Sequence, residues 1–141
     1  MRLTFAKNMR HYLTTLLLLV CFFVSGCGSV HDEQITGPYR LIAVDIDAQM
    51  SLSYDLGNGS AIGRINETVF AYGFDKQYIV AMQHPKGNRS ITHFYYLDMA
   101  KDSKYADPEV SVIGPLSKKD FDAASKRLGL PKISQFIDRL K

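Results

Sequence analysis

Several features that would point directly to an activity are missing from this sequence of 141 residues. It contains none of the motifs G-x-S-x-G, H-E-x-x-H, C-x-x-C or the P-loop, so it gives no sign of the catalytic and nucleotide-binding classes that those motifs define. Tryptophan is absent, but eight tyrosines and eight phenylalanines can still supply an aromatic-rich core. A chain of this length holds one domain at most, and its candidate catalytic residues are few.

The chain also lacks a hydrophobic run long enough to span a membrane. Its longest run, Tyr12–Val24, has thirteen mostly apolar residues and would reach only about 20 Å as a helix, against about 30 Å for the hydrocarbon core. No acidic residue occurs before Asp32, and three basic residues precede the run: Arg2, Lys7 and Arg10. A basic region, a short apolar stretch and a small-residue exit define a secretory signal peptide. We therefore predict that residues 1–26 are a signal peptide that is removed, with Met9 as an alternative start to Met1.

The segment Val24-Ser25-Gly26-Cys27 ends this run and resembles the lipobox of bacterial lipoproteins: an aliphatic residue, a small residue, Gly or Ala, then Cys. The resemblance implies cleavage before Cys27, a diacylglycerol thioether on its thiol, and an N-acyl chain such as palmitate on the new amino group. It also implies a lipid-anchored protein of the cell envelope, on the outer membrane if the cell is Gram-negative. The alternative is that Cys27 is an ordinary thiol after an unusual signal peptide.

Removal of the signal peptide changes the charge and the cysteine count. Three basic residues and no acidic ones leave with it, so the mature chain has 14 of each sign and a formal net charge of zero. A neutral domain gives no indication of nucleic-acid binding. Cys21 leaves as well and Cys27 is acylated, so the mature chain has no free thiol for a disulfide. We predict no cofactor other than the covalent lipid.

The mature chain divides into a lipidated tether, residues 27–37, and a single globular domain, residues 38–141. The tether has no periodicity and ends at the turn signal Gly37-Pro38. Strand-length runs then follow at hairpin spacing with a clear Asn58-Gly59 turn: 39–45, 51–56, 62–65, 68–74, 77–84, 90–99 and 110–113. The runs 62–65 and 68–74 are either one bent strand or two. Strands without intervening helices predict an antiparallel meander.

The C-terminal part changes to a helical period. Ser117 with Asp120 three residues later reads as a capping box, and Gly129 stands where a helix would end. Apolar stripes predict helices over 117–128 and 132–140: Phe121, Ala124 and Leu128 in the first, Ile133, Phe136, Ile137 and Leu140 in the second. We therefore predict an α+β fold in which both helices pack on one face of the sheet. The alternative is that these stripes bind a partner.

Two histidines are the candidates for a metal site. His84 and His93 flank the loop 85–90. If His84 lies opposite Ile91, then His93 faces Met82 and the two imidazoles share one sheet face, about 7–8 Å apart. A register shift of one residue would place them on opposite faces. Because a third ligand is not evident, we predict no metal and interpret them as a turn-flanking and a half-buried strand histidine.

Two further groups have a functional and a structural interpretation. Asp45 and Asp47, two residues apart at a strand end, either bind calcium or act as an acid–base pair, or they end the strand and solvate a loop. Six strand aromatics form either a binding surface or the core, and core is the default for alternating aromatics: Phe70, Tyr72, Tyr78, Phe94, Tyr95 and Tyr96.

The body of the chain carries a second resemblance. The segments SLSYDLGNGSAIGRINETVFAYGFDKQYIVAMQHP and VIGPLSKKDF resemble a family of small bacterial lipoproteins of unknown function, over most of residues 38–121. That resemblance implies no activity and carries across only Cys27 as a functional position. Two hypotheses follow. The first, which the absent motifs favour, is a non-enzymatic binding module (assembly factor, inhibitor or immunity type) with an envelope protein or saccharide as partner. The second is a small hydrolase or metal-binding protein using His84 and His93.

Overall fold

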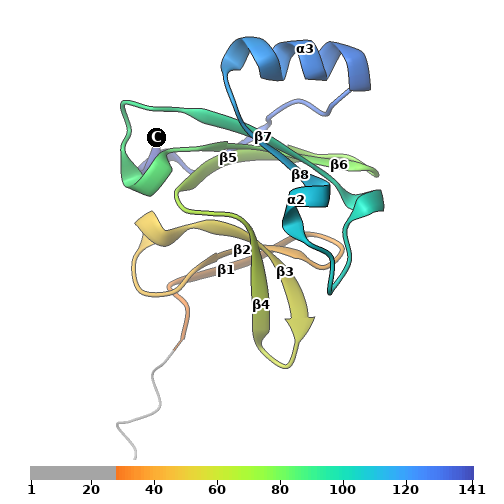
Figure 1. Ribbon diagram of the computed structural model, residues 1–141. Helices are drawn as coiled ribbons and strands as arrows, with labels where there is room; N and C mark the ends of the chain where they lie inside the picture. The colour runs from red at the N-terminus through yellow and green to blue at the C-terminus, as the bar shows by residue number, and fades with distance from the viewer. Residues whose placement is uncertain (1–27) are drawn as a thin grey trace, which may run out of the picture.

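The computed structural model describes residues 28–141, which fold into three layers (Figure 1). Sheet 1 has the strand order β1-β2-β3-β4, and sheet 2 has the order β8-β7-β6-β5-β9. The helix α3 (Lys118–Leu128) covers the face of sheet 2 that points away from sheet 1. Neighbouring strands pair antiparallel throughout both sheets. The prediction of a mainly antiparallel β protein with a few helices is confirmed, although the strands form two sheets.

Sheet 1 is a meander of consecutive strands: β1 (His31–Thr36), β2 (Tyr39–Ala43), β3 (Ser51–Gly57) and β4 (Ser60–Ile65). The short 3₁₀ helix η1 (Asp47–Gln49) joins β2 to β3. The predicted hairpin turn forms between β3 and β4, where Asn58 and Gly59 have φ angles of 61° and 75°. Positive φ at both central residues matches the right-handed twist of the strands, which is why Asn-Gly is favoured there.

Sheet 2 contains β5 (Val69–Phe74), β6 (Tyr78–Gln83), β7 (His93–Asp98), β8 (Val112–Leu116) and β9 (Gln135–Phe136). Residues 66–68 carry the chain from sheet 1 to sheet 2, so the runs 62–65 and 68–74 belong to two strands in different sheets. Short helices occupy the connections: η2 (Pro85–Gly87), η3 (Met99–Lys101) and α2 (Pro108–Ser111). The helix α2 takes the place of the first half of the strand predicted over 110–113.

The domain has two apolar cores, one on each face of sheet 2. Between the sheets, the fully buried Leu41 and Leu52 of sheet 1 share a cluster with Ile79 and Leu97 of sheet 2. On the other face, Val80, Phe94 and Tyr96 pack with α3 through Phe121 and Ala124. Burial on both faces explains why β5, β6 and β7 are apolar almost without interruption, since successive strand residues point to opposite sides.

The tether prediction is wrong for residues 31–36, which form the edge strand β1. The strand is polar and mostly exposed, so it carries no hydrophobic alternation. Backbone pairing with β2 holds it, with Asp32 opposite Ile42. Side-chain contacts add to this pairing: Ile35 packs against the core between the sheets, and Tyr72 of β5 donates a hydrogen bond from its hydroxyl to Glu33 Oε1 at 2.9 Å. Only residues 28–30 separate Cys27 from this strand.

The first C-terminal helix is confirmed and the second is not. In α3 the backbone N–H of Asp120 donates to Ser117 Oγ at 3.1 Å, and Gly129 ends the helix with a φ of 67°. Residues 132–140 instead form β9 and the 3₁₀ helix η4 (Asp138–Leu140). The chain pairs there with the edge of β5, where Gly73 has no side chain: the Lys132 carbonyl occupies the position that a Cβ would take. Edge pairing has therefore overridden the helical period.

Candidate functional site

The predicted lipidation site, Cys27, and the signal peptide 1–26 lie outside the described residues. The described chain begins at Gly28, and its first segment, orange in Figure 1, leads into β1 on the side of the molecule away from α3. All the other candidate residues lie within the described part of the chain.

The structure does not bring His84 and His93 together. The register pairs Gln83 with His93 and Met82 with Phe94, one residue away from the register that would put both imidazoles on one face. That register hypothesis is wrong, because the connection is not a tight hairpin: it contains η2 and extends to residue 92. Within residues 28–141, no three His, Cys, Asp or Glu side chains are grouped to hold a metal ion.

His84 is a buried structural residue, with 4% of its surface exposed. Its ring stacks on Phe70 with centroids 4.0 Å apart, and Nδ1 donates to the Ile91 carbonyl at 2.8 Å. This hydrogen bond closes the loop that follows β6. Nε2 is buried and has no hydrogen-bond partner among residues 28–141. His93 is half-buried in β7, as predicted for a strand histidine.

Asp47 has a structural partner that the sequence did not reveal. Arg139, near the C-terminus, donates to it from Nε at 2.6 Å and from Nη2 at 2.9 Å. These hydrogen bonds lower the pKa of the Asp47 carboxyl. The backbone N–H of Asp45 donates instead to Gln49 Oε1 at 2.9 Å, within the turn that holds η1. Asp45 and Asp47 therefore have the structural role: they follow the end of β2 and fix the loop that contains η1.

Four of the six strand aromatics are buried, which supports the core interpretation: Phe70, Tyr72, Phe94 and Tyr96. Tyr78 and Tyr95 are half-buried. Tyr78 meets Tyr96 edge to face, with ring centroids 6.3 Å apart.

Tyr72 also gives the domain a predicted sensitivity to alkali. Burial, followed by the hydrogen bond to Glu33, raises the pKa of its hydroxyl to about 12, against about 10 in the unfolded chain. The unfolded state therefore loses this proton first, and the free energy of unfolding should fall as the pH rises from about 10 towards 12. Urea unfolding at pH 8 and pH 11 should show a smaller loss for Tyr72→Phe than for wild type. Tyr105→Phe is the matched control, because Tyr105 is 87% exposed, and it should leave the loss unchanged.

A buried ion pair between Arg64 and Asp102 is the largest feature that the sequence analysis missed. The Arg64 Nε–Asp102 Oδ2 distance is 2.8 Å, and both side chains are 0% exposed. Tyr39 donates its hydroxyl to the same carboxylate oxygen at 3.0 Å, and Arg64 Nη2 donates to the Ser103 carbonyl at 2.9 Å. Burial, followed by the hydrogen bond to Asp102, raises the pKa of the Tyr39 hydroxyl well above its usual value. The pair fastens the loop after η3 to sheet 1, and no sequence signal links two positions so far apart.

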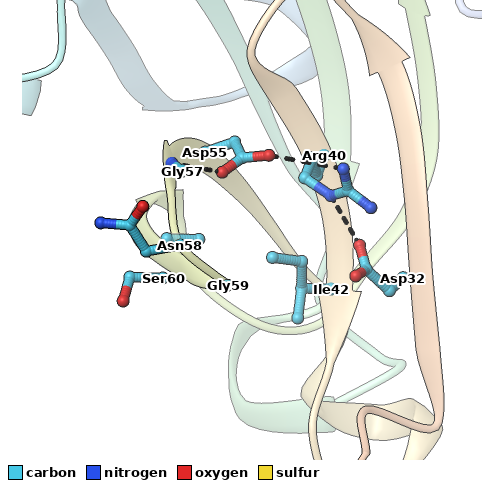
Figure 2. Close-up of a pocket in the computed structure, with 9 residues that line it drawn as sticks. Asp32, Arg40, Ile42, Asp55, Gly57, Asn58, Gly59 and Ser60 are labelled. Carbon is cyan, nitrogen blue, oxygen red and sulfur yellow. Dashed lines mark hydrogen bonds and ion pairs between the residues drawn. The ribbon is translucent and has the colours of Figure 1, made fainter.

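Figure 2 shows a pocket of about 260 Å³ on the outer face of sheet 1, beside the β3–β4 hairpin. Arg40 lies between two carboxylates, with Nε 2.7 Å from Asp32 and Nη1 3.4 Å from Asp55. Asp55 also accepts a hydrogen bond from the backbone N–H of Gly57 at 2.7 Å, which shapes the turn. Both carboxylates compensate the guanidinium, so this pocket does not present an unpaired cation to an anionic ligand.

A second cleft of about 360 Å³ lies where β6, β7, α2 and the end of α3 meet. Tyr78 and Tyr96 provide its aromatic surface. Charges of both signs surround them: Asp98, Lys101, Glu109 and Arg127. Four of the nine residues that line this cleft are charged, so it combines aromatic side chains, which are frequent at binding surfaces, with hydrogen-bonding groups. The two tyrosines are among the strand aromatics predicted from the sequence, but the charged residues come from separate segments, and no sequence pattern groups them.

The fold and these clefts define a small antiparallel β domain of two packed sheets with one covering helix. The chain belongs to the family of proteins of unknown function DUF3997, which matches residues 36–139. The match begins at the end of β1 and reaches η4, so it covers nearly the whole domain. Comparison with curated proteins and with solved structures finds no significant match.

Proposed function

We propose that this protein is a lipoprotein of the cell envelope, anchored through Cys27, whose domain is a non-enzymatic binding module. The observation that carries the proposal is the order of segments in the sequence: a basic region, the apolar run Tyr12–Val24, and then Val24-Ser25-Gly26-Cys27. Two or three acyl chains anchor a protein stably, whereas a single one binds only marginally. Among residues 28–141, no helix is long and apolar enough to cross a bilayer.

The structure adds a constraint on where the module would work. Since β1 begins at His31, the Cα atoms of Cys27 and His31 are at most about 14 Å apart. The domain would therefore lie directly against the bilayer and meet partners at the membrane surface. An envelope protein or saccharide is the partner class that we propose.

The cleft around Tyr78 and Tyr96 supports the binding role better than the Arg40 pocket does. Aromatic rings offer an apolar contact to a peptide or sugar ring, and Glu109 with Arg127 adds exposed charged groups of both signs to the same cleft. In the Arg40 pocket, by contrast, Asp32 and Asp55 already engage the main polar group.

Cell fractionation tests the anchor. Wild-type protein should be recovered with the membranes and should resist a salt wash, because acyl chains hold it by burial of CH₂ groups. Cys27→Ser should block lipid attachment and the associated cleavage. A version in which an ordinary cleavable signal replaces residues 1–27 should be soluble and folded. If that version still pellets with membranes after the salt wash, Cys27 is not the only anchor.

A further inference from the structure

An exposed apolar patch lies at the end of sheet 1 that is next to Cys27. It consists of Val30, Val44 and Ile46, whose exposed fractions are 54%, 55% and 58%. The backbone N–H of Val30 donates to the Val44 carbonyl at 3.2 Å, so these two residues lie side by side ahead of the first β1–β2 pair. Ile46 follows Val44 by two residues and precedes η1.

We propose that this patch rests in the interfacial region of the bilayer and sets the orientation of the whole domain. The inference depends on the lipid anchor proposed above. Cys27 precedes Val30 by three residues, a span of about 10 Å at most. A lipidated Cys27 would therefore hold the patch within reach of the headgroup region. Large exposed apolar patches mark protein or membrane contact sites. This one has only three residues, and we assign it to a membrane because Cys27 would bring one to it.

The charges around the patch favour apolar contact over attraction to anionic lipid. Asp32 is paired with Arg40 at 2.7 Å, and Asp47 is paired with Arg139 at 2.6 Å. Asp45 lies between Val44 and Ile46, and within residues 28–141 its carboxylate makes no ion pair. The surface therefore has no positive excess that would select an anionic membrane, and a zwitterionic one suffices.

The patch is small, so it would orient an anchored domain without holding a soluble one on the membrane. The lipid chains raise its effective concentration at the surface, and a weak contact then becomes occupied. In this orientation sheet 1 is next to the bilayer and α3 is on the far side of the molecule (Figure 1). The helix and the adjoining end of the tyrosine cleft would then be presented to partners away from the lipid.

Site-directed spin labelling of the lipidated full-length mature protein tests this orientation. Cys21 is lost with the signal peptide and the thiol of Cys27 is blocked by its lipid, so one introduced cysteine is the only reactive thiol. Val44→Cys probes the patch, Ile46→Cys is a second probe, and Ala123→Cys on the exposed side of α3 is the control. In phosphatidylcholine vesicles, the label at 44 should be several-fold less accessible to a water-soluble nickel complex than the label at 123, and more accessible to oxygen.

Three outcomes would contradict the proposals in distinguishable ways. If the protein floats with the vesicles and its mass includes the lipid, but both patch labels are as accessible to the nickel complex as the control, the orientation is wrong and the anchor stands. If the patch labels are shielded from oxygen as well as from the nickel complex, another protein chain covers the patch. The proposed contact between the patch and the bilayer is then wrong, and the anchor stands. If the protein carries no lipid and does not float, the proposed function itself fails.

Discussion

Asp102→Ala should lower the free energy of unfolding by about 3–5 kcal/mol, because it leaves the Arg64 guanidinium buried without its counter-charge. The Arg64 side chain is 0% exposed and cannot reach water without opening the loop after η3. Tyr39 loses the acceptor of its hydroxyl in the same substitution. A domain of this size has about 5–15 kcal/mol of stability in total, so the urea midpoint should fall sharply.

An exposed pair of the same chemistry provides the control. Arg139 and Asp47 have a contact of 2.6 Å, slightly shorter than the 2.8 Å of the buried pair, but their side chains are 50% and 40% exposed. Solvent screens such a pair and can hydrate the partner that remains, so Asp47→Ala should move the midpoint very little. Replacing both buried partners, with Arg64→Met and Asp102→Leu, should recover part of the lost stability because no unpaired charge remains. Equal midpoint shifts for Asp102→Ala and Asp47→Ala would contradict this account of the pair.

Phe121→Ala should cost about 3–5 kcal/mol, because it removes the ring that fixes α3 on sheet 2. The Phe121 ring is 6% exposed, and its centroid lies 5.2 Å from that of Phe94. Neighbouring side chains in a close-packed core relax only partly, so a cavity adds to the loss of apolar burial.

Phe136→Ala is the matched control, because it removes a phenyl ring of the same size from the second predicted apolar stripe. The helical period predicts that Phe136 faces the core, but the structure places it in β9 with 49% of its surface exposed. Its loss should therefore cost less than half as much as that of Phe121. Thermal or urea unfolding of both variants decides the point: equal losses would mean that residues 132–140 pack as a second helix after all.

The parts of the fold that the sequence predicted are those with local signals. Asn58-Gly59 specifies its hairpin through backbone conformation alone. The helix α3 begins at Ser117, whose hydroxyl accepts a hydrogen bond from the backbone of the first turn, and ends at Gly129, which adopts a positive φ angle. Strand positions followed from runs of apolar and β-branched residues. Each of these signals acts within a few residues along the chain.

The parts that were missed depend on contacts between distant segments. The strands β1 and β9 form because a neighbouring strand offers an unpaired edge: β1 is polar, and β9 has only two residues within a segment of helical period. The register of His93 is set by the η2 loop, whose Lys86 has a φ of 50°. The Arg64–Asp102 pair joins residues 38 positions apart in the sequence. Register here follows from the conformation of a connecting loop, whereas sheet membership and the buried ion pair depend on contacts between distant segments that no local period encodes.

The central claim is that Cys27 becomes the lipidated N-terminus of the mature protein, and mass spectrometry of the protein purified from its own cells tests it most directly. We predict an N-terminal peptide that begins at Cys27 and carries a diacylglycerol thioether, with or without a further acyl chain on the amino group. A mature chain that begins at another residue, or one in which Cys27 is an unmodified thiol, would contradict the claim.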